Sequence, residues 1–123
     1  MRSRNLPESF RCAFAGLGHA LRTQRNFRIH LSITIAVLVL GLWLNLPAGH
    51  WAILALTIGF VLASETLNTA AEALVDLVSP DYHPLARITK DVMAGAVLLT
   101  AIVAVVVGLL ILGPPLWTRL VGR

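Results

Sequence analysis

Three carboxylates share one face of an otherwise apolar stretch of the sequence. On a helix, which advances about 100° per residue, Glu65, Glu72 and Asp76 project within about 40° of one another. Asn68 and Thr69 border this acidic stripe. Ionised acids at membrane depth each cost on the order of several kcal/mol unless a proton or a cation accompanies them. Because hard oxygen ligands favour magnesium, which usually accompanies phosphate, the stripe predicts a magnesium and phosphate site.

Cationic residues follow the acidic stripe across the next loop. Pro84 suits the first turn of a helix, which places Arg87, Lys90 and Asp91 in the opening turns, near one end of the stripe. Cations opposite a magnesium-binding stripe can hold a nucleotide polyphosphate even without a Gly-rich phosphate loop. The alternative is a surface pair of Arg87 with Asp91 and a Lys90 side chain that reaches into water.

The composition indicates that these residues are carried by a membrane protein. The chain has 123 residues, of which 57% are hydrophobic and only 13% are charged. That is too apolar for an ordinary soluble domain and too short for a multi-domain enzyme, so we expect one membrane-embedded domain over 1–123. The single cysteine, Cys12, excludes an intrachain disulfide and a cysteine-rich zinc module.

Long uncharged runs predict three membrane-spanning helices. No Asp, Glu, Lys or Arg occurs between positions 31 and 64, where only a turn-like segment with Pro47 and Gly49 interrupts the apolar residues. A third uncharged run ends at Trp117 and is long enough to cross a bilayer alone. We therefore expect an all-α integral membrane fold whose three membrane helices cover the ranges 27–46, 51–78 and 84–117.

The distribution of basic residues predicts the orientation. Six of the ten precede the first apolar run, namely Arg2, Arg4, Arg11, Arg22, Arg25 and Arg28. We expect this segment and the loop 79–91 to share the cytoplasmic side, with Arg119 and Arg123 as minor exceptions outside. A cleaved signal peptide is not expected, because the apolar run starts only after about 28 polar and basic residues. Binding of nucleic acid is disfavoured, since the rest of the chain suits lipid.

The N-terminal segment has the pattern of an amphipathic surface helix over 5–25. Asn5 and Glu8 have capping-box spacing. Phe10, Phe14 and Leu17 recur on one face at helical spacing. Such a helix can lie in the membrane interface with its cations near lipid phosphates, or pack against the bundle with its basic face in water.

Several segments of the sequence resemble those of a known family. The run Glu65-Thr-Leu-Asn68-Thr-Ala-Ala-Glu72-Ala-Leu-Val-Asp76 is similar to the signature of prokaryotic diacylglycerol kinases at every position but Ala71. The resemblance extends to the segments 9–16, 25–30, 82–86, 90–91 and 94–99. The stretches N-F-R-I-H and Y-H-P-L-A look more like the branch that includes undecaprenol kinases of Gram-positive bacteria.

The resemblance implies an integral-membrane homotrimer that phosphorylates a lipid hydroxyl from MgATP, with active sites completed by neighbouring subunits. It implies that Glu65 is the general base and Glu72 a metal ligand. The residues that it places around the nucleotide and the catalytic site are Asn68, Asp76, Lys90 and Asp91, and we add Arg11 and His83 as candidates. The chemistry agrees, since a carboxylate beside a lipid alcohol can accept its proton while magnesium and Lys90 neutralise the phosphate oxygens.

The sequence departs from the family pattern at Gln24, where relatives commonly carry a glutamate that helps to bind the metal. An amide oxygen can still coordinate magnesium but supplies less charge, so we expect Gln24 to be a weaker ligand beside Glu72. None of the four histidines has metal-ligand spacing with another. His19, His30 and His50 are therefore expected to be interfacial or hydrogen-bonding residues, and His83 lies beside the expected nucleotide site.

These features favour an ATP-dependent lipid kinase of the bacterial cytoplasmic membrane, with undecaprenol preferred over diacylglycerol as substrate. A rival from another class is a proton or cation conductor in which Glu65 and Glu72 of several chains form an acidic ring. A third possibility is an inactive relative that acts as a scaffold, suggested by Gln24. The acids could also be merely structural, paired with basic residues or placed where the helix end meets water.

Overall fold

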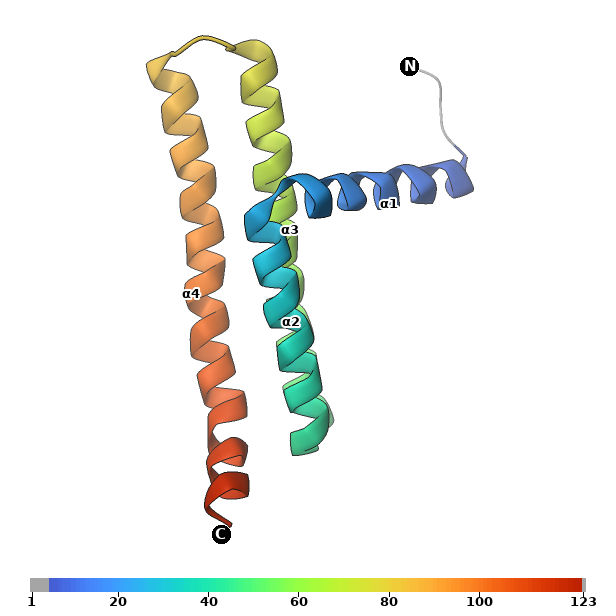
Figure 1. Cartoon of the computed structure of the whole chain (residues 1–123), viewed down its shortest axis with the longest axis vertical. Coiled ribbons are helices and arrows are strands. Elements are labelled where there is room, and N and C mark those ends of the chain that lie inside the picture. Colours follow the sequence, from blue (N-terminus) through green and yellow to red (C-terminus); the bar gives the residue numbers. More distant parts are fainter. Residues whose placement is uncertain (1–4, 123) are drawn as a thin grey trace.

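The computed structural model describes residues 5–122 and contains four helices. In chain order they are α1 (Leu6–Thr23), α2 (Arg25–Leu44), α3 (Ala48–Val78) and α4 (Pro84–Val121). The last three lie side by side, whereas α1 leaves the start of α2 at a steep angle and extends away from them (Figure 1). Among the described residues, α2, α3 and α4 are the helices long and apolar enough to cross a membrane. The expected all-α membrane architecture is confirmed; Arg2, Arg4 and Arg123 lie outside the described range.

α1 is the expected N-terminal amphipathic helix, and it begins with a complete capping box. The Glu8 amide donates to the side-chain oxygen of Asn5 at 2.9 Å, and the Asn5 amide donates to the Glu8 carboxylate at 3.4 Å. The helix is two residues shorter at its end than expected, because the backbone is extended at Gln24 and α2 starts immediately afterwards. The rings of Phe10 and Phe14 are exposed, so this apolar face of α1 is not covered by the other described residues.

The hairpin between α2 and α3 is tighter than the sequence indicates. α2 ends at Leu44 rather than at position 46, because Asn45 adopts the left-handed conformation (φ 53°, ψ 54°) that this residue type tolerates. α3 begins at Ala48 rather than at position 51, directly after Pro47. A Cβ atom at Gly41 would lie 2.7 Å from the Trp51 ring, so the absence of a side chain permits this close approach.

α4 starts as expected and continues further than expected. Pro84 occupies the first turn, and the side chain of His83 accepts a hydrogen bond from the Leu85 amide at 3.1 Å. The helix passes through Pro114 and Pro115 and ends at Val121, four residues beyond the expected end. The prolines remove two amide donors but do not end the helix, because the turn before them packs into the main hydrophobic cluster. That cluster consists of Leu44, Leu46, Leu54, Ile111 and Leu112.

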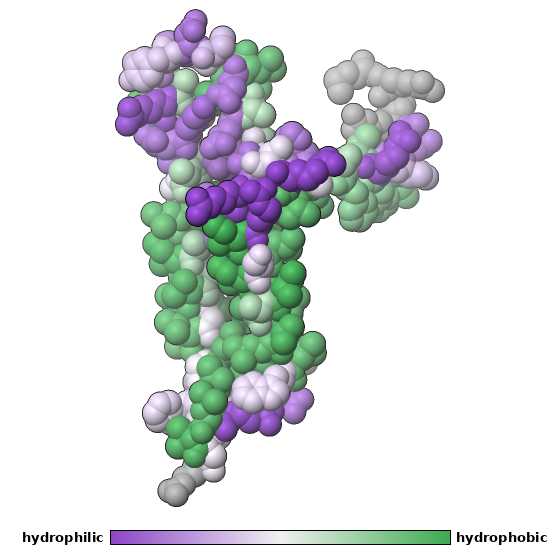
Figure 2. Space-filling view, viewed as in Figure 1, coloured by the Kyte–Doolittle hydropathy of each residue, from purple (hydrophilic) through white to green (hydrophobic). Residues whose placement is uncertain are grey.

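The surface polarity divides the molecule along its length. Apolar residues cover the part of the bundle away from the α3–α4 loop, whereas polar residues gather at that loop and where α1 meets α2 (Figure 2). Arg119 lies at the opposite end of the bundle, stacked over the Trp43 ring at 4.8 Å and donating to the Trp43 carbonyl. Most large apolar side chains are exposed, as expected for a chain solvated by lipid rather than by water.

Candidate active site

The acidic stripe of α3 runs from the interior of the bundle to its polar end. Glu65 is 2% exposed and Asn68 is 9% exposed, although both are polar. Glu72 is half-buried and Asp76 is exposed. Along this single face of α3, the carboxylates therefore become steadily more exposed, from buried Glu65 to exposed Asp76.

α2 contributes a histidine to the buried end of the stripe. The Nε2 atom of His30 lies 3.1 Å from Oε1 of Glu65. The two groups are close but not aligned for a linear hydrogen bond, and within residues 5–122 this carboxylate oxygen has no aligned donor. The contact of His30 with Glu65 was not predicted from the sequence. The pairing depends on how α2 and α3 are aligned, for which no local pattern gives a signal.

The His30–Glu65 contact also fixes which part of α3 lies beside Gln24. Gln24 precedes His30 by six residues, and Glu72 follows Glu65 by seven on the antiparallel neighbour. At 1.5 Å per residue, Gln24 lies about 9 Å and Glu72 about 10.5 Å from the contact, toward the polar end. The α1–α2 junction thus brings Gln24 to the height of Glu72. The side chain of Gln24 makes no capping hydrogen bond to α2, so capping does not occupy its amide oxygen.

α4 supplies a cation to the open end of the stripe. The ammonium group of Lys90 donates to the carboxylate of Asp76 at 2.7 Å. Glu72 lies within electrostatic range of Lys90 on one side and of Glu65 on the other. Lys90 therefore joins the stripe rather than extending freely into water. The alternative surface pair of Arg87 and Asp91 is also present, at 4.0 Å and with both side chains mostly exposed.

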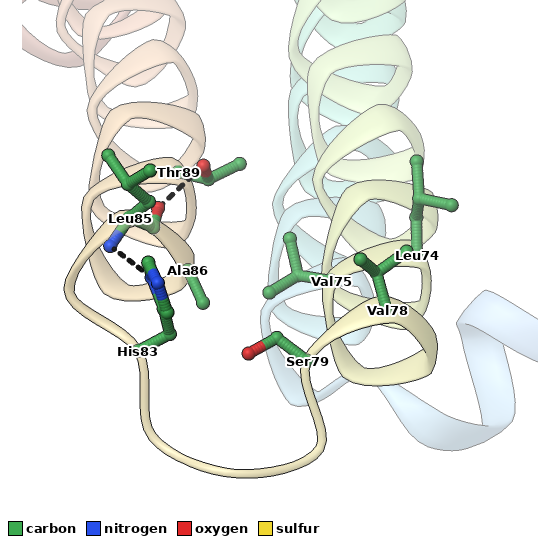
Figure 3. A pocket seen from close by; sticks show the side chains of 8 residues that line it. All are labelled: Leu74, Val75, Val78, Ser79, His83, Leu85, Ala86 and Thr89. Carbon is green, nitrogen blue, oxygen red and sulfur yellow. Dashed lines mark hydrogen bonds between the residues drawn. The ribbon is translucent and has the colours of Figure 1, made fainter.

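Two hollows open between the ends of α3 and α4. One, of about 320 Å³, is lined by Asp76, His83, Lys90 and Asp91 together with neighbouring loop residues. This hollow gathers four of the six candidate nucleotide-binding residues. The other, of about 440 Å³, shares His83 and is otherwise mostly apolar (Figure 3).

Arg11 and Asn68 are the two candidates that do not line these hollows. Arg11 is exposed on α1, which points away from the bundle. Asn68 lies deeper on α3, and its side-chain oxygen is buried without a hydrogen-bond partner among the described residues. One chain therefore brings most of the expected site together but leaves Arg11 apart from it.

The oxygen donors suit a hard cation but do not form a complete site in one chain. Within residues 5–122, no group of three His, Cys, Asp or Glu side chains converges as metal ligands do. The unpartnered amide oxygen of Asn68 lies one turn from Glu72, and Gln24 stands level with Glu72 on the neighbouring helix. Carboxylate and amide oxygens are ligands that magnesium accepts, together with phosphate and water.

Comparison with known proteins gives consistent results. A family model described as prokaryotic diacylglycerol kinase matches residues 11–112. A diacylglycerol kinase of Synechocystis is 52% identical over 118 residues, which cover 95% of this chain and 67% of the relative. The undecaprenol kinase of Bacillus subtilis is 42% identical over 109 residues, 89% of each chain. A diacylglycerol kinase of Escherichia coli is 33% identical over 94 residues, 76% of this chain and 77% of the relative.

Proposed function

Because this chain belongs to the prokaryotic diacylglycerol kinase family and is a lipid kinase, we propose that it transfers the γ-phosphoryl group of ATP to the hydroxyl group of undecaprenol. The acidic stripe carries the proposal. Its inner end is a buried carboxylate, Glu65, and its outer end is a carboxylate, Asp76, held against Lys90. Phosphoryl transfer to an alcohol needs a proton acceptor near the alcohol and positive charge near the phosphates.

Glu65 has the role of general base in this proposal. The lipid hydroxyl donates its proton to the Glu65 carboxylate while its oxygen bonds to the γ-phosphorus. The bond from the γ-phosphorus to the bridging oxygen of ADP breaks, so the products are the lipid phosphate, ADP and one proton. The buried Oε1 atom without an aligned donor is an acceptor of the required kind. Its burial excludes water, which would otherwise compete with the lipid as nucleophile.

Lys90 and Asp76 bind and orient the nucleotide. In the proposed complex the ammonium group of Lys90 contacts phosphate oxygens, and Asp76 holds the ammonium group in place. Asn68, His83 and Asp91 complete the polar surroundings of the phosphates and the reacting groups. The sequence contains no Gly-rich phosphate-binding loop. In this proposal these side chains therefore supply the energy that binds the nucleotide phosphates.

Magnesium would be held by Glu72, with the amide oxygens of Gln24 and Asn68 beside it, and would neutralise negative charge on the phosphates. One chain provides too few ligands for a closed site, which agrees with a nucleotide that completes the coordination. We further propose a homotrimer in which a neighbouring copy contributes to each site. The face of α4 at Gly95 supports it, because a Cβ at that position would meet no atom within 4 Å, so another helix can approach closely there.

The proposed location is the bacterial cytoplasmic membrane with the site on the cytoplasmic side. Arg22, Arg25 and Arg28 flank the α1–α2 junction. The polar surface at this junction and at the α3–α4 loop lies on one side of the apolar part of the bundle (Figure 2). The guanidinium group of Arg28 donates to the carbonyls of Leu21 and Arg22 at 3.1 and 2.9 Å and so holds the junction. In the proposed orientation these three arginines lie next to the lipid headgroups.

Diacylglycerol is the second candidate substrate, favoured by the 52% identity with the Synechocystis relative. Undecaprenol is preferred because the segment N-F-R-I-H contains His30, the residue that contacts Glu65, and because the undecaprenol kinase relative matches 89% of both chains. The family membership gives no support to the ion-conductor alternative.

A direct competition between the two lipids tests the substrate. Purified protein in mixed micelles receives γ-labelled MgATP and equal mole fractions of undecaprenol and diacylglycerol. We expect kcat/KM for undecaprenol to exceed that for diacylglycerol by about tenfold or more, the discrimination that about 1.4 kcal/mol of differential binding provides. Equal turnover, or preference for diacylglycerol, would reject undecaprenol as the preferred substrate.

Replacing Gln24 by glutamate tests the metal site. The added carboxylate stands level with Glu72, so the Mg²⁺ concentration for half-maximal activity should fall by about three- to tenfold. The control is Thr23→Glu, which adds the same side chain at the adjacent exposed position. Activity is measured over a magnesium titration at fixed ATP. An unchanged magnesium dependence in Gln24→Glu would contradict the role of Gln24 as a ligand.

A further inference from the structure

The contact between α2 and the buried carboxylate has a consequence for the reaction. We infer that His30 is a positioning residue that holds the Glu65 carboxylate ready to accept the proton of the lipid alcohol. The inference rests on the proposed function and deepens it, because it assigns a role to a residue outside the acidic stripe.

The geometry makes His30 the partner of Glu65 from another helix. The Nε2 atom lies 3.1 Å from Oε1, and the Glu65 side chain is 2% exposed whereas that of His30 is 21% exposed. The turn that carries His30 is itself held in place: Phe27 is buried, and the hydroxyl of Thr34 donates to the His30 carbonyl at 2.8 Å. The imidazole is therefore fixed on one side and open to its surroundings on the other.

Glu65 needs such a partner because its other neighbours do not favour its charge. Glu72, on the same helix, repels it. On α4, the polar group at this level is the hydroxyl of Thr100, which shares a hydrogen bond with the hydroxyl of Ser64 at 3.0 Å and carries no charge. The His30 imidazole, with Nε2 3.1 Å from Oε1, is then the principal group that can stabilise the ionised, proton-accepting form.

His30 also adjoins the place from which a lipid reaches the base. Its side chain lies at the polar end of an apolar groove of about 440 Å³ between α2, α3 and α4, whose wall includes Ile33, Val37, Leu54, Val61 and Ala104. The carboxylate that contacts His30 therefore lies next to the hydrocarbon-lined part of the chain and not only next to the nucleotide hollow. A residue in this position can align the base with an alcohol that arrives from the membrane side.

Two substitutions of His30 separate positioning from packing. His30→Leu removes the N–H donor, and kcat should fall about tenfold while the KM for ATP stays within about twofold. His30→Gln keeps an N–H donor on a side chain of similar reach and should retain kcat within about threefold of the wild type. The matched control is His50→Leu, the same substitution at an exposed histidine in the first turn of α3, at the other end of the bundle, which should retain wild-type kcat. Thermal unfolding in the same micelles identifies any variant that has lost its fold.

A spectroscopic measurement tests the contact without relying on turnover. In protein labelled with ¹⁵N at its four histidines, His30→Gln identifies the His30 ring signals by their loss. These signals should move in Glu65→Gln and stay unchanged in Glu8→Gln, the same substitution at the start of α1. The measurement also decides the matter if His30→Leu fails to fold.

The outcomes distinguish this inference from the proposed function. Loss of turnover in His30→Leu with recovery in His30→Gln supports the positioning role. Wild-type turnover in His30→Leu, an equal loss in both variants, or His30 signals that ignore Glu65→Gln would overturn it. A wild-type chain that phosphorylates no lipid would instead overturn the proposed function.

Discussion

Replacing Glu65 by glutamine is expected to lower kcat by about 10²- to 10⁴-fold, the range that a positioned general base contributes. The amide keeps the shape and the burial of the carboxylate but cannot take the proton of the lipid hydroxyl. The KM for ATP should change little, because in the proposed complex Lys90 and Asp76, rather than Glu65, contact the nucleotide. Initial rates of phosphate transfer from labelled ATP, measured over a range of ATP concentrations, give both parameters.

The control for Glu65→Gln is the same substitution at Glu8. Glu8 caps α1 at the far end of that helix, and glutamine serves equally well at this position of a capping box. Glu8→Gln should therefore keep wild-type turnover. A Glu65→Gln variant that folds normally and retains more than about a tenth of wild-type kcat would show that another group accepts the proton.

The second largest effect is expected for Lys90→Met, which should lower kcat/KM for ATP by about 10- to 100-fold. The magnitude corresponds to the loss of a hydrogen bond to a charged group, about 1.5 to 3 kcal/mol. Methionine keeps most of the length of the side chain but removes the charge that Asp76 holds in place. The dependence on lipid concentration should stay close to that of the wild type, because in the proposed complex the lipid hydroxyl meets Glu65, at the other end of the stripe.

Arg119→Met provides the comparison, since it removes one positive charge at the opposite end of the bundle, beside Trp43. It should leave the kinetic parameters for ATP unchanged. A Lys90→Met variant with the ATP dependence of Arg119→Met would remove Lys90 from the nucleotide site.

Much of the architecture could be predicted because it depends on local patterns. Uncharged runs of sufficient length identify membrane helices, and the Asn5 and Glu8 spacing identifies the start of α1. The start of α4 after His83 could also be predicted, since proline favours the first turn of a helix. The predicted end of α4 at position 117 follows from the end of the uncharged run, but the helix continues past Arg119 to Val121, and the contact of Arg119 with Trp43 on another helix has no local signal.

The site could be predicted along α3 but not between helices. Helical periodicity alone places Glu65, Glu72 and Asp76 on one face. Which cation meets Asp76 depends on the reversal of the chain through the α3–α4 loop, which selects Lys90 and leaves Arg87 with Asp91. The His30 contact depends in the same way on the short hairpin, because a shift of one residue there would turn the imidazole away from Glu65.

The most direct test of the central claim follows labelled phosphate into lipid in sealed vesicles that contain the wild-type chain or Glu65→Gln, with γ-labelled MgATP outside. The expected result is labelled undecaprenyl phosphate in the organic extract of the wild-type vesicles and about a hundredth of that amount or less with Glu65→Gln. Equal labelling by the two proteins would contradict the role of the acidic stripe. Proton or cation flux without nucleotide, and with no labelled lipid, would contradict the kinase itself.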